Sequence, residues 1–156
     1  MLSQKAKYAL KALLALAQSP GGELLQCGEI AAQENIPKKF LDLILLELRK
    51  HGVIDSVRGK HGGYILLRPA GKITIGDIIR IVDGPLAPIA CASVTGYRRC
   101  KDCKNESACM VRLMMRDVRD AASGILDQMT LADAAEAGRA RDLVLKRRKR
   151  VLSKAA

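Results

Sequence analysis

The stretch from Gly28 to Arg68 reads GEIAAQENIPKKFLDLILLELRKHGVIDSVRGKHGGYILLR and contains the signals that decide the fold. Its apolar residues recur first with the period of a helix and later in short runs separated by glycines. We predict a helix over 28–34, a turn, a second helix over 38–51 and then a β-hairpin. Gly52 follows the second helix, where glycine commonly ends helices.

The second of these helices has the features of a DNA-reading helix. Lys38, Lys39 and Asp42 lie at its N-terminal end, where a recognition helix reaches base edges, so we expect them to contact DNA. An ordinary amphipathic helix with a solvated charged face is the alternative, and the pattern leaves open whether Leu43 faces outward or inward. The expected apolar face consists of Phe40, Leu41, Ile44, Leu45 and Leu48.

The predicted hairpin has a basic tip rich in glycine. Its strands are expected over 53–57 and 64–68, and the tip between them contains Arg58, Lys60 and His61. We expect Arg58 to enter a minor groove and the other two side chains to bind phosphates. The glycine spacing matches neither a dinucleotide-binding fingerprint nor a P-loop. A helix-turn-helix followed by such a hairpin is a winged-helix arrangement.

Two more helices complete the expected DNA-binding domain. The apolar residues between Lys5 and Gln18 follow a helical stripe, and Thr74 can cap a short helix over 75–82. We therefore assign residues 1–83 to a winged helix-turn-helix domain. The fold class is mainly α with a small β-hairpin.

Residues 84–109 contain four of the five cysteines and show no apolar period up to about Asn105. Cys91, Cys100, Cys103 and Cys109 have the spacing C-x8-C-x2-C-x5-C. Thiolates gathered without histidine favour an iron–sulfur cluster, Zn²⁺ or Cu(I), and redox chemistry without a metal is a further possibility. We expect a flexible loop that a bound group would order. Cys27, remote in sequence, is expected to be inert.

A long helix is predicted over 110–129. Its apolar residues alternate at spacings of four and three, as in a coiled-coil interface, and we expect them to pack against a second copy of the chain. Packing within the same chain is the alternative. The predicted interface residues are Val111, Met115, Val118, Ala122 and Ile125, continued by Met129.

Residues 130–156 are expected to form a short helix and a basic tail. Thr130 can cap a helix over 131–136, and Lys146 to Arg150 form a run of five cationic residues. A solvated charge run is one interpretation of the tail, and nonspecific attraction to phosphates is the other.

The overall composition favours some classes of protein and argues against others. A formal net charge of +11 indicates a polyanionic partner, and an aromatic content of only 3% argues against a protein that stacks on single-stranded bases. Clustered cysteines without a secretion signal or a membrane-spanning segment predict a cytoplasmic protein. The Cys100–Cys103 pair has the spacing of a dithiol oxidoreductase but lacks a βαβ context, so we expect no enzyme.

Four stretches resemble the Rrf-two-type family of bacterial winged-helix transcription regulators, which includes IscR, NsrR and RirA. They are LSQKAKYALKALLALA from Leu2, the segment from Ile30 to Pro69, ITIGDIIRIVDGPLAP from Ile73, and the cysteine segment. The resemblance covers residues 1 to about 136. It implies a homodimer that binds double-stranded operator DNA, with affinity controlled by an iron–sulfur cluster that senses iron, redox state or nitric oxide.

The resemblance also implies which residues hold the cluster, of either the 2Fe-2S or the 4Fe-4S type. Cys91, Cys103 and Cys109 match the family's three cysteines best, and Cys100 is an extra thiol or a replacement. Some members use an acidic ligand where this chain has Lys7, and others a histidine where it has Arg112. Neither can ligate as those residues do, so Cys100 is the natural substitute and gives an all-thiolate site, and a solvent-exposed iron is the alternative. A cluster-free thiol switch and a zinc-stabilised DNA-binding protein are the alternatives.

Overall fold

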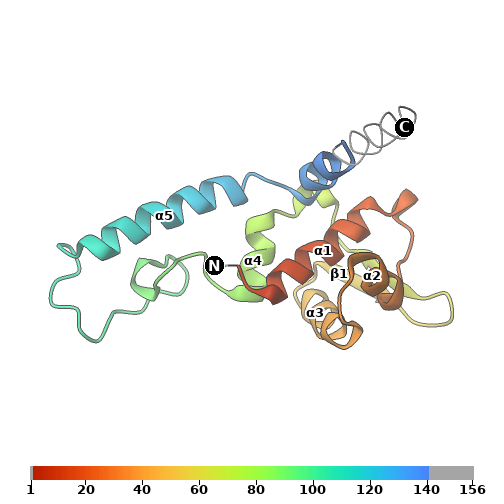
Figure 1. Cartoon of the computed structure of the whole chain (residues 1–156), viewed down its shortest axis with the longest axis horizontal. Helices are drawn as coiled ribbons and strands as arrows, with labels where there is room; N and C mark the ends of the chain where they lie inside the picture. The colour runs from red at the N-terminus through yellow and green to blue at the C-terminus, as the bar shows by residue number, and fades with distance from the viewer. Residues whose placement is uncertain (1, 141–156) are drawn as a thin grey trace, which may run out of the picture.

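A head of helices and a small hairpin is the main body of the protein in the computed structural model, which describes residues 2–140 (Figure 1). The predicted helix-turn-helix and wing are confirmed, with ends within a few residues of those expected. The elements of the head are α1 (Gln4–Gln18), α2 (Cys27–Glu34), α3 (Lys38–Lys50), β1 (Ile54–Val57), β2 (Gly63–Leu66) and α4 (Ile75–Asp83).

Helix α1 is the centre of the core and contacts α2, α3, α4 and β2. Ala6, Ala9 and Ala12 are fully buried on it, and their small side chains let the neighbouring helices approach closely. Ser3 caps this helix, because its hydroxyl oxygen accepts a hydrogen bond from the Ala6 amide at 3.0 Å. Larger aliphatic side chains fill the space around α1: Leu13, Ile30, Leu41, Ile44, Leu45, Leu48, Ile73 and Ile78.

The turn between α2 and α3 depends on Asn35, which adopts the left-handed conformation with φ 51°. Four of the five residues predicted for the apolar face of α3 are buried, but Phe40 is 44% exposed. The prediction for Phe40 is therefore wrong. Its ring lies at the rim of the core, where it meets the edge of Tyr8 on α1 with ring centroids 5.9 Å apart.

The wing contains one more chain segment than the sequence predicts. Strands β1 and β2 pair antiparallel, with Ile54 opposite Leu66 and Val57 opposite Gly63. Leu25, in the loop before α2, adds a bridge to Tyr64: each amide donates to the other carbonyl, at 3.1 and 2.8 Å. A single bridge of this kind leaves no periodic pattern in the sequence, so it is visible only in the folded structure.

A long connection and an extended helix follow the head. Between residues 84 and 109 the chain forms a single 3-10 turn, η3 (Ala90–Ala92), so the prediction of no regular element is wrong only for this turn. Helix α5 (Met110–Leu126) then runs alongside this connection and stands away from the head (Figure 1).

The chain returns to the head after α5. A helix begins at Leu131 and continues to Ala140, the last described residue, so it is longer than the predicted 131–136. Thr130 caps it as expected, by accepting from the Asp133 amide at 3.2 Å. Leu131 is fully buried, and its amide donates to the Ile73 carbonyl at 2.9 Å. The predicted basic run from Lys146 lies outside the described residues.

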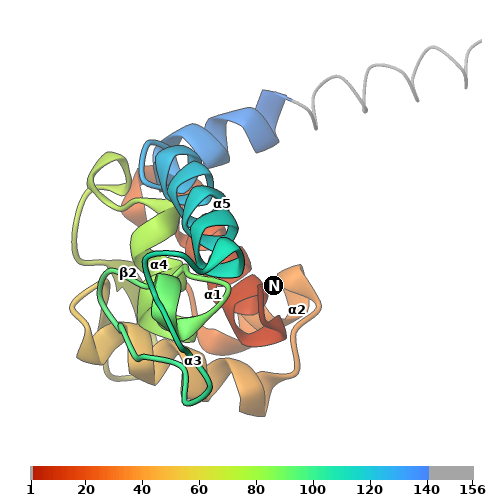
Figure 2. The same ribbon diagram turned by 90° about the vertical axis from the view of Figure 1, so that its left-hand side faces the viewer.

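The two functional regions suggested by the sequence lie at different places in this architecture. Helix α3 is at the lower side of the molecule in both views (Figures 1 and 2), and in Figure 1 the connection between α4 and α5, which carries the four clustered cysteines, lies to the left of the head. No helix within residues 2–140 combines the length and apolarity that crossing a membrane requires.

Replacing Gly62 by Ala is expected to strain the wing. A Cβ atom at this position would overlap the Val57 carbonyl oxygen, so the hairpin backbone must move. We expect the free energy of unfolding to fall by about 1–3 kcal/mol, measured by urea denaturation followed by circular dichroism. Gly28→Ala is the matched control, because a Cβ there meets open space. Equal denaturation midpoints for the two variants would contradict this account of the wing.

Candidate functional site

The four clustered cysteines line one pocket of about 510 Å³ beside the N-terminal end of α5. Cys91 is buried, Cys103 and Cys109 are half-buried, and Cys100 is exposed. Ile89, Val111 and Arg112 also line the pocket, among other residues. The folded chain thus gathers thiols that are up to 18 positions apart in the sequence (109 − 91).

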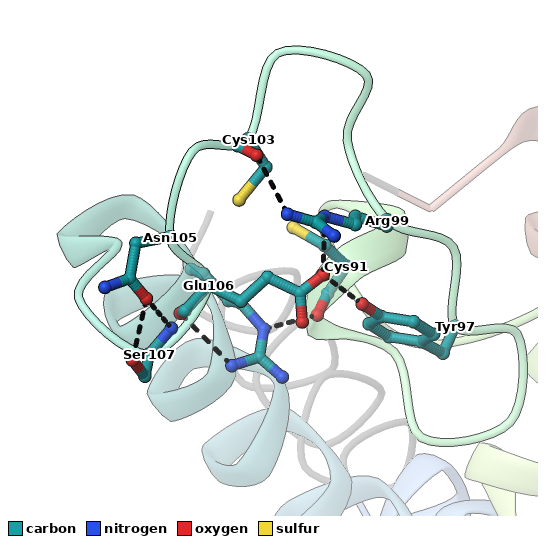
Figure 3. Close-up of polar contacts among 8 residues, drawn as sticks. Cys91, Tyr97, Arg99, Cys103, Asn105, Glu106 and Ser107 are labelled. Carbon is teal, nitrogen blue, oxygen red and sulfur yellow. Dashed lines mark hydrogen bonds and ion pairs between the residues drawn. The ribbon is translucent and has the colours of Figure 1, made fainter.

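Polar side chains hold the path of the loop around this pocket (Figure 3). The Glu106 carboxylate accepts a hydrogen bond from the Tyr97 hydroxyl and forms an ion pair with Arg99, whose Nε lies 3.3 Å from Oε1. Arg99 also donates to the Cys103 carbonyl oxygen at 3.1 Å. The loop therefore has ordering contacts of its own, in addition to any that a group bound to the thiols would provide.

Cys109 lies where the loop enters α5, as the N-cap residue of that helix. The preceding turn is closed by the Asn105 side chain, which accepts from the Ser107 amide at 3.0 Å (Figure 3). A helix N-terminus favours negative charge, and so do neighbouring cationic side chains. Lys104 and Arg112 line the same pocket as Cys109. The Cys109 side chain therefore lies beside a helix N-terminus and in a pocket that two cationic side chains line.

Cys91 and Cys100 line the same pocket and influence each other. A hydrogen bond between their side chains is the main cause that raises the pKa of Cys100, and burial adds to it. Nearby Asp102 and Cys109 raise this pKa further through their negative charge. Without a bound cation, Cys100 therefore keeps its proton more readily than a free cysteine does.

Two arginines of α5 hold the start of the cysteine loop. Arg112 Nε donates to the Cys91 carbonyl oxygen at 2.9 Å, and Arg119 donates to the Ala92 carbonyl oxygen. Arg119 is only 9% exposed. The two residues are seven positions apart and so lie on one face of the helix. This pair, which we name the arginine clamp, fixes η3 to α5.

The opposite face of α5 is apolar and exposed. Val111, Val118 and Ile125 of the predicted interface are 60%, 50% and 64% exposed. The predicted residues Met115 and Ala122 are instead half-buried on the side of α5 that carries the arginine clamp. Met114, 56% exposed, lies on the outward face in place of Met115. The exposed stripe, which we name the outer stripe, consists of Met110, Val111, Met114, Val118, Ala121 and Ile125.

An ion pair joins the far end of α5 to the head. Arg80 of α4 donates two hydrogen bonds to the Asp127 carboxylate, at 2.6 and 2.8 Å. These bonds lower the pKa of Asp127 and raise that of Arg80. Gly76 leaves the room that this pair occupies, because a Cβ there would overlap the Asp127 carboxylate.

The donor chemistry of the pocket suits a thiolate-bound metal group. Soft thiolates without histidine are the usual ligands of iron–sulfur clusters. Within residues 2–140, no three His, Cys, Asp or Glu side chains are arranged to hold a single metal ion.

The residues predicted to contact DNA are all exposed, on two neighbouring elements. Lys38, Lys39 and Asp42 lie on α3, whereas Arg58, Lys60 and His61 lie on the wing tip between β1 and β2. Hydrogen bonds fix the wing relative to the helices: Arg49 of α3 donates to the Ser56 hydroxyl at 2.8 Å, and the Gln26 side chain donates to the Lys60 carbonyl at 3.3 Å.

Cys27 lies in this head and not among the residues that line the cysteine pocket. Burial and then a hydrogen bond with the Asp42 side chain raise the pKa of its thiol to about 12. A thiol with so high a pKa stays protonated and reacts slowly, which supports the expectation that Cys27 is inert.

The sequence did not indicate the arginine clamp or the place of Met114. The resemblance places Arg112 only where some family members have a histidine ligand, and no sequence pattern marks Arg119. Their spacing of seven residues on a helix beside a cysteine loop is the signal that could have paired them. An amphipathic pattern with two adjacent methionines cannot tell which of them faces outward.

Known proteins resemble the chain along most of its length. A family model described as Rrf2, iron-dependent transcriptional regulator, matches residues 2–137. An rrf2-like HTH-type transcriptional regulator of Rhodobacter capsulatus is 43% identical over 141 residues, which cover 88% of this chain and 94% of that protein. The HTH-type transcriptional regulator IscR of Citrobacter koseri is 30% identical over 132 residues, 85% of this chain and 77% of that protein.

A solved structure supports the same assignment. The structure of CymR, the global cysteine regulator of B. subtilis, has a TM-score of 0.70 and 32% sequence identity, and the match covers 87% of this chain and 96% of that one. The winged-helix fold, the family model and these relatives agree. The chain therefore belongs to the Rrf2 family of transcriptional regulators, which bind DNA.

Proposed function

We propose that the protein is a homodimeric regulator whose affinity for operator DNA is controlled by an iron–sulfur cluster. Cys91, Cys103 and Cys109 would hold the cluster, with Cys100 as the fourth thiolate. The observation that carries this proposal is the convergence of all four thiols on one pocket. The iron-dependent family model and the IscR relative support it.

A helix N-terminus and two cationic side chains lie beside the expected cluster ligands. Cys109 caps a helix of 17 residues, and Arg112 and Lys104 line the pocket. Once bound, a cluster would join cysteines from the start, middle and end of the loop, so its loss to iron starvation, an oxidant or nitric oxide would release the loop. The 2Fe-2S and 4Fe-4S types both suit four thiolates.

The contacts of α5 form a route from the pocket to the DNA-binding head. The arginine clamp fixes the backbone of Cys91 and Ala92 to α5. At the other end of the helix, the ion pair between Arg80 and Asp127 fixes α5 to α4. Helix α4 in turn packs against α1 and α3. A shift of the loop would therefore tilt α5 relative to α3.

We expect the outer stripe to pack against the same stripe of a second copy. Its exposed valines, methionines and isoleucine lose contact with water in such a dimer, which stabilises it. Two heads that read successive major grooves must stand about 34 Å apart. A tilt of α5 at the dimer axis would change this separation and hence the affinity for operator DNA.

In this proposal the head reads DNA through both of its exposed basic elements. Lys38, Lys39 and Asp42 would approach base edges at the start of α3. Arg58 would enter the adjacent minor groove, while Lys60 and His61 bind phosphates.

A cluster-free thiol switch is a second candidate, favoured by the position of Cys91 and Cys100 in one pocket. Two thiols in contact can form a disulfide when an oxidant accepts their electrons. The structural similarity to CymR, a cysteine regulator, is compatible with this candidate.

Anaerobic purification is the first test of the cluster. We expect iron and acid-labile sulfide in matching amounts, little zinc, and a visible charge-transfer band. Cys103→Ala should remove most of the iron and leave a folded dimer, because the core does not include this residue. Cys27→Ser, outside the pocket, is the control and should keep the iron. Zinc alone, or an unchanged iron content in Cys103→Ala, would refute the cluster; no metal at all would favour the thiol switch.

Arg119→Ala is expected to uncouple the loop from the head. The four cysteines remain, so the iron content should stay close to that of the wild type. Because η3 loses a buried contact, the ratio of the DNA affinities of the cluster-loaded and cluster-free forms should shrink several-fold, measured by fluorescence anisotropy. Arg116→Ala removes an exposed arginine one turn earlier and should leave this ratio unchanged. An unaltered ratio in Arg119→Ala would exclude the arginine clamp from the route.

Arg58→Ala is expected to weaken operator binding about tenfold, since a charged groove contact is worth about 1–3 kcal/mol. Its iron content should not change, because the wing is remote from the cysteine pocket. Wild-type affinity at the same salt concentration would remove Arg58 from the DNA interface.

A further inference from the structure

The outward face of α3 carries two leucines that the core does not use. Leu43 is 65% exposed and Leu46 is 41% exposed. They lie between Lys39 and Lys50 along the face directly opposite the buried residues of the helix, which are Leu41, Ile44, Leu45 and Leu48. The structure thereby decides the orientation that the sequence left open for Leu43.

Contacts on both flanks of α3 fix the rotation of the helix. On one flank Arg49 donates to Ser56 of the wing and Asp42 meets Cys27 of α2. On the other flank the Glu47 carboxylate lies 2.6 Å from Lys5 Nζ. Phe40 meets Tyr8 on this second flank. Leu43 lies between the two flanks, so the helix cannot turn it into the core without breaking these contacts.

A single exposed leucine is common on protein surfaces, so a role for Leu43 must be argued from the residues around it. Leu43 lies in the second turn of α3, one position after Asp42 and four after Lys39. Lys38, Lys39, Lys50 and Arg49 of the same helix are exposed and cationic. This charge pattern is complementary to a polyanion, and the family binds DNA. The occupant that fits the face is therefore the major groove of a duplex.

The major groove offers one apolar group on the edges of its bases, the C5-methyl of thymine. A leucine side chain has no hydrogen-bond donor or acceptor and gains free energy only by contact with such a group. We propose that Leu43 is a specificity-determining residue that contacts a thymine methyl in each operator half-site, next to the bases reached by Lys39 and Asp42. This inference rests on the proposed operator binding.

Deoxyuridine tests this contact, because it differs from thymidine only by the missing methyl group. The full-length protein, in whichever of its cluster-loaded and cluster-free forms binds DNA, is first used to select operator sequences from a random duplex library. Each thymine of the selected half-site is then replaced in turn by uracil. Removal of one buried methyl group should weaken binding about fourfold per half-site at one position and leave the other positions nearly unchanged.

Three variants separate Leu43 from its neighbours. Leu43→Ala should bind the thymine and uracil operators equally, whereas Leu43→Met, with a side chain of similar volume, should keep most of the discrimination. Lys39→Ala should weaken binding to both operators by the same factor. Leu46→Ala should keep the discrimination.

The outcomes distinguish this inference from the function on which it rests. Discrimination that persists in Leu43→Ala, or that is lost in Leu46→Ala instead, would overturn the role of Leu43. A selected operator without any uracil-sensitive position would also overturn it, while sequence-specific binding would stand. Failure of the selection to enrich any sequence would refute operator binding itself and the inference with it.

Discussion

The hydrogen bonds from Arg112 and Arg119 to the carbonyl oxygens of Cys91 and Ala92 hold the cysteine loop against α5. The part of the molecule that lies outside the head depends on these contacts. The connection between α4 and α5 has almost no regular structure, and its single 3-10 turn, η3, packs against α5. An arginine as buried as Arg119 is costly unless its donors are satisfied, and here a backbone carbonyl and the neighbouring Asp120 satisfy them. The arginine clamp therefore sets where the cysteine pocket forms.

The arginine clamp gives α5 two faces with different surroundings. The face of the arginine clamp holds the loop, and the outer stripe is left for another apolar surface. Since the clamp turns Met115 and Ala122 toward the loop side, it also turns Met114 outward. On the face of the arginine clamp, Arg112 donates to the backbone carbonyl of Cys91 beside the cysteine pocket.

In the head, the contacts of α3 likewise give one helix faces with different surroundings. Buried aliphatic residues on one side and contacts on both flanks leave a single exposed face, which combines lysines with leucines. Lysines supply attraction to phosphates that depends little on sequence, whereas an apolar side chain responds to the presence or absence of a methyl group. In the proposed function, different residues of α3 would therefore provide the affinity for DNA and the selectivity among DNA sequences.

The sequence by itself determined the elements and which of their residues share a face. A period of 3.6 residues placed the helices, the glycine-rich basic tip placed the wing, and the spacing of the four cysteines singled out the loop, because each of these signals is local. Tertiary structure alone decided that four thiols share one pocket, that Leu25 joins the wing, that Phe40 stays at the rim and Leu43 faces outward, and that Arg119 is buried. A period fixes which residues share a face, but not which face meets a neighbour. A loop whose apolar residues follow no period does not show even which residues share a face. Where such a loop packs is decided by contacts between distant parts of the chain.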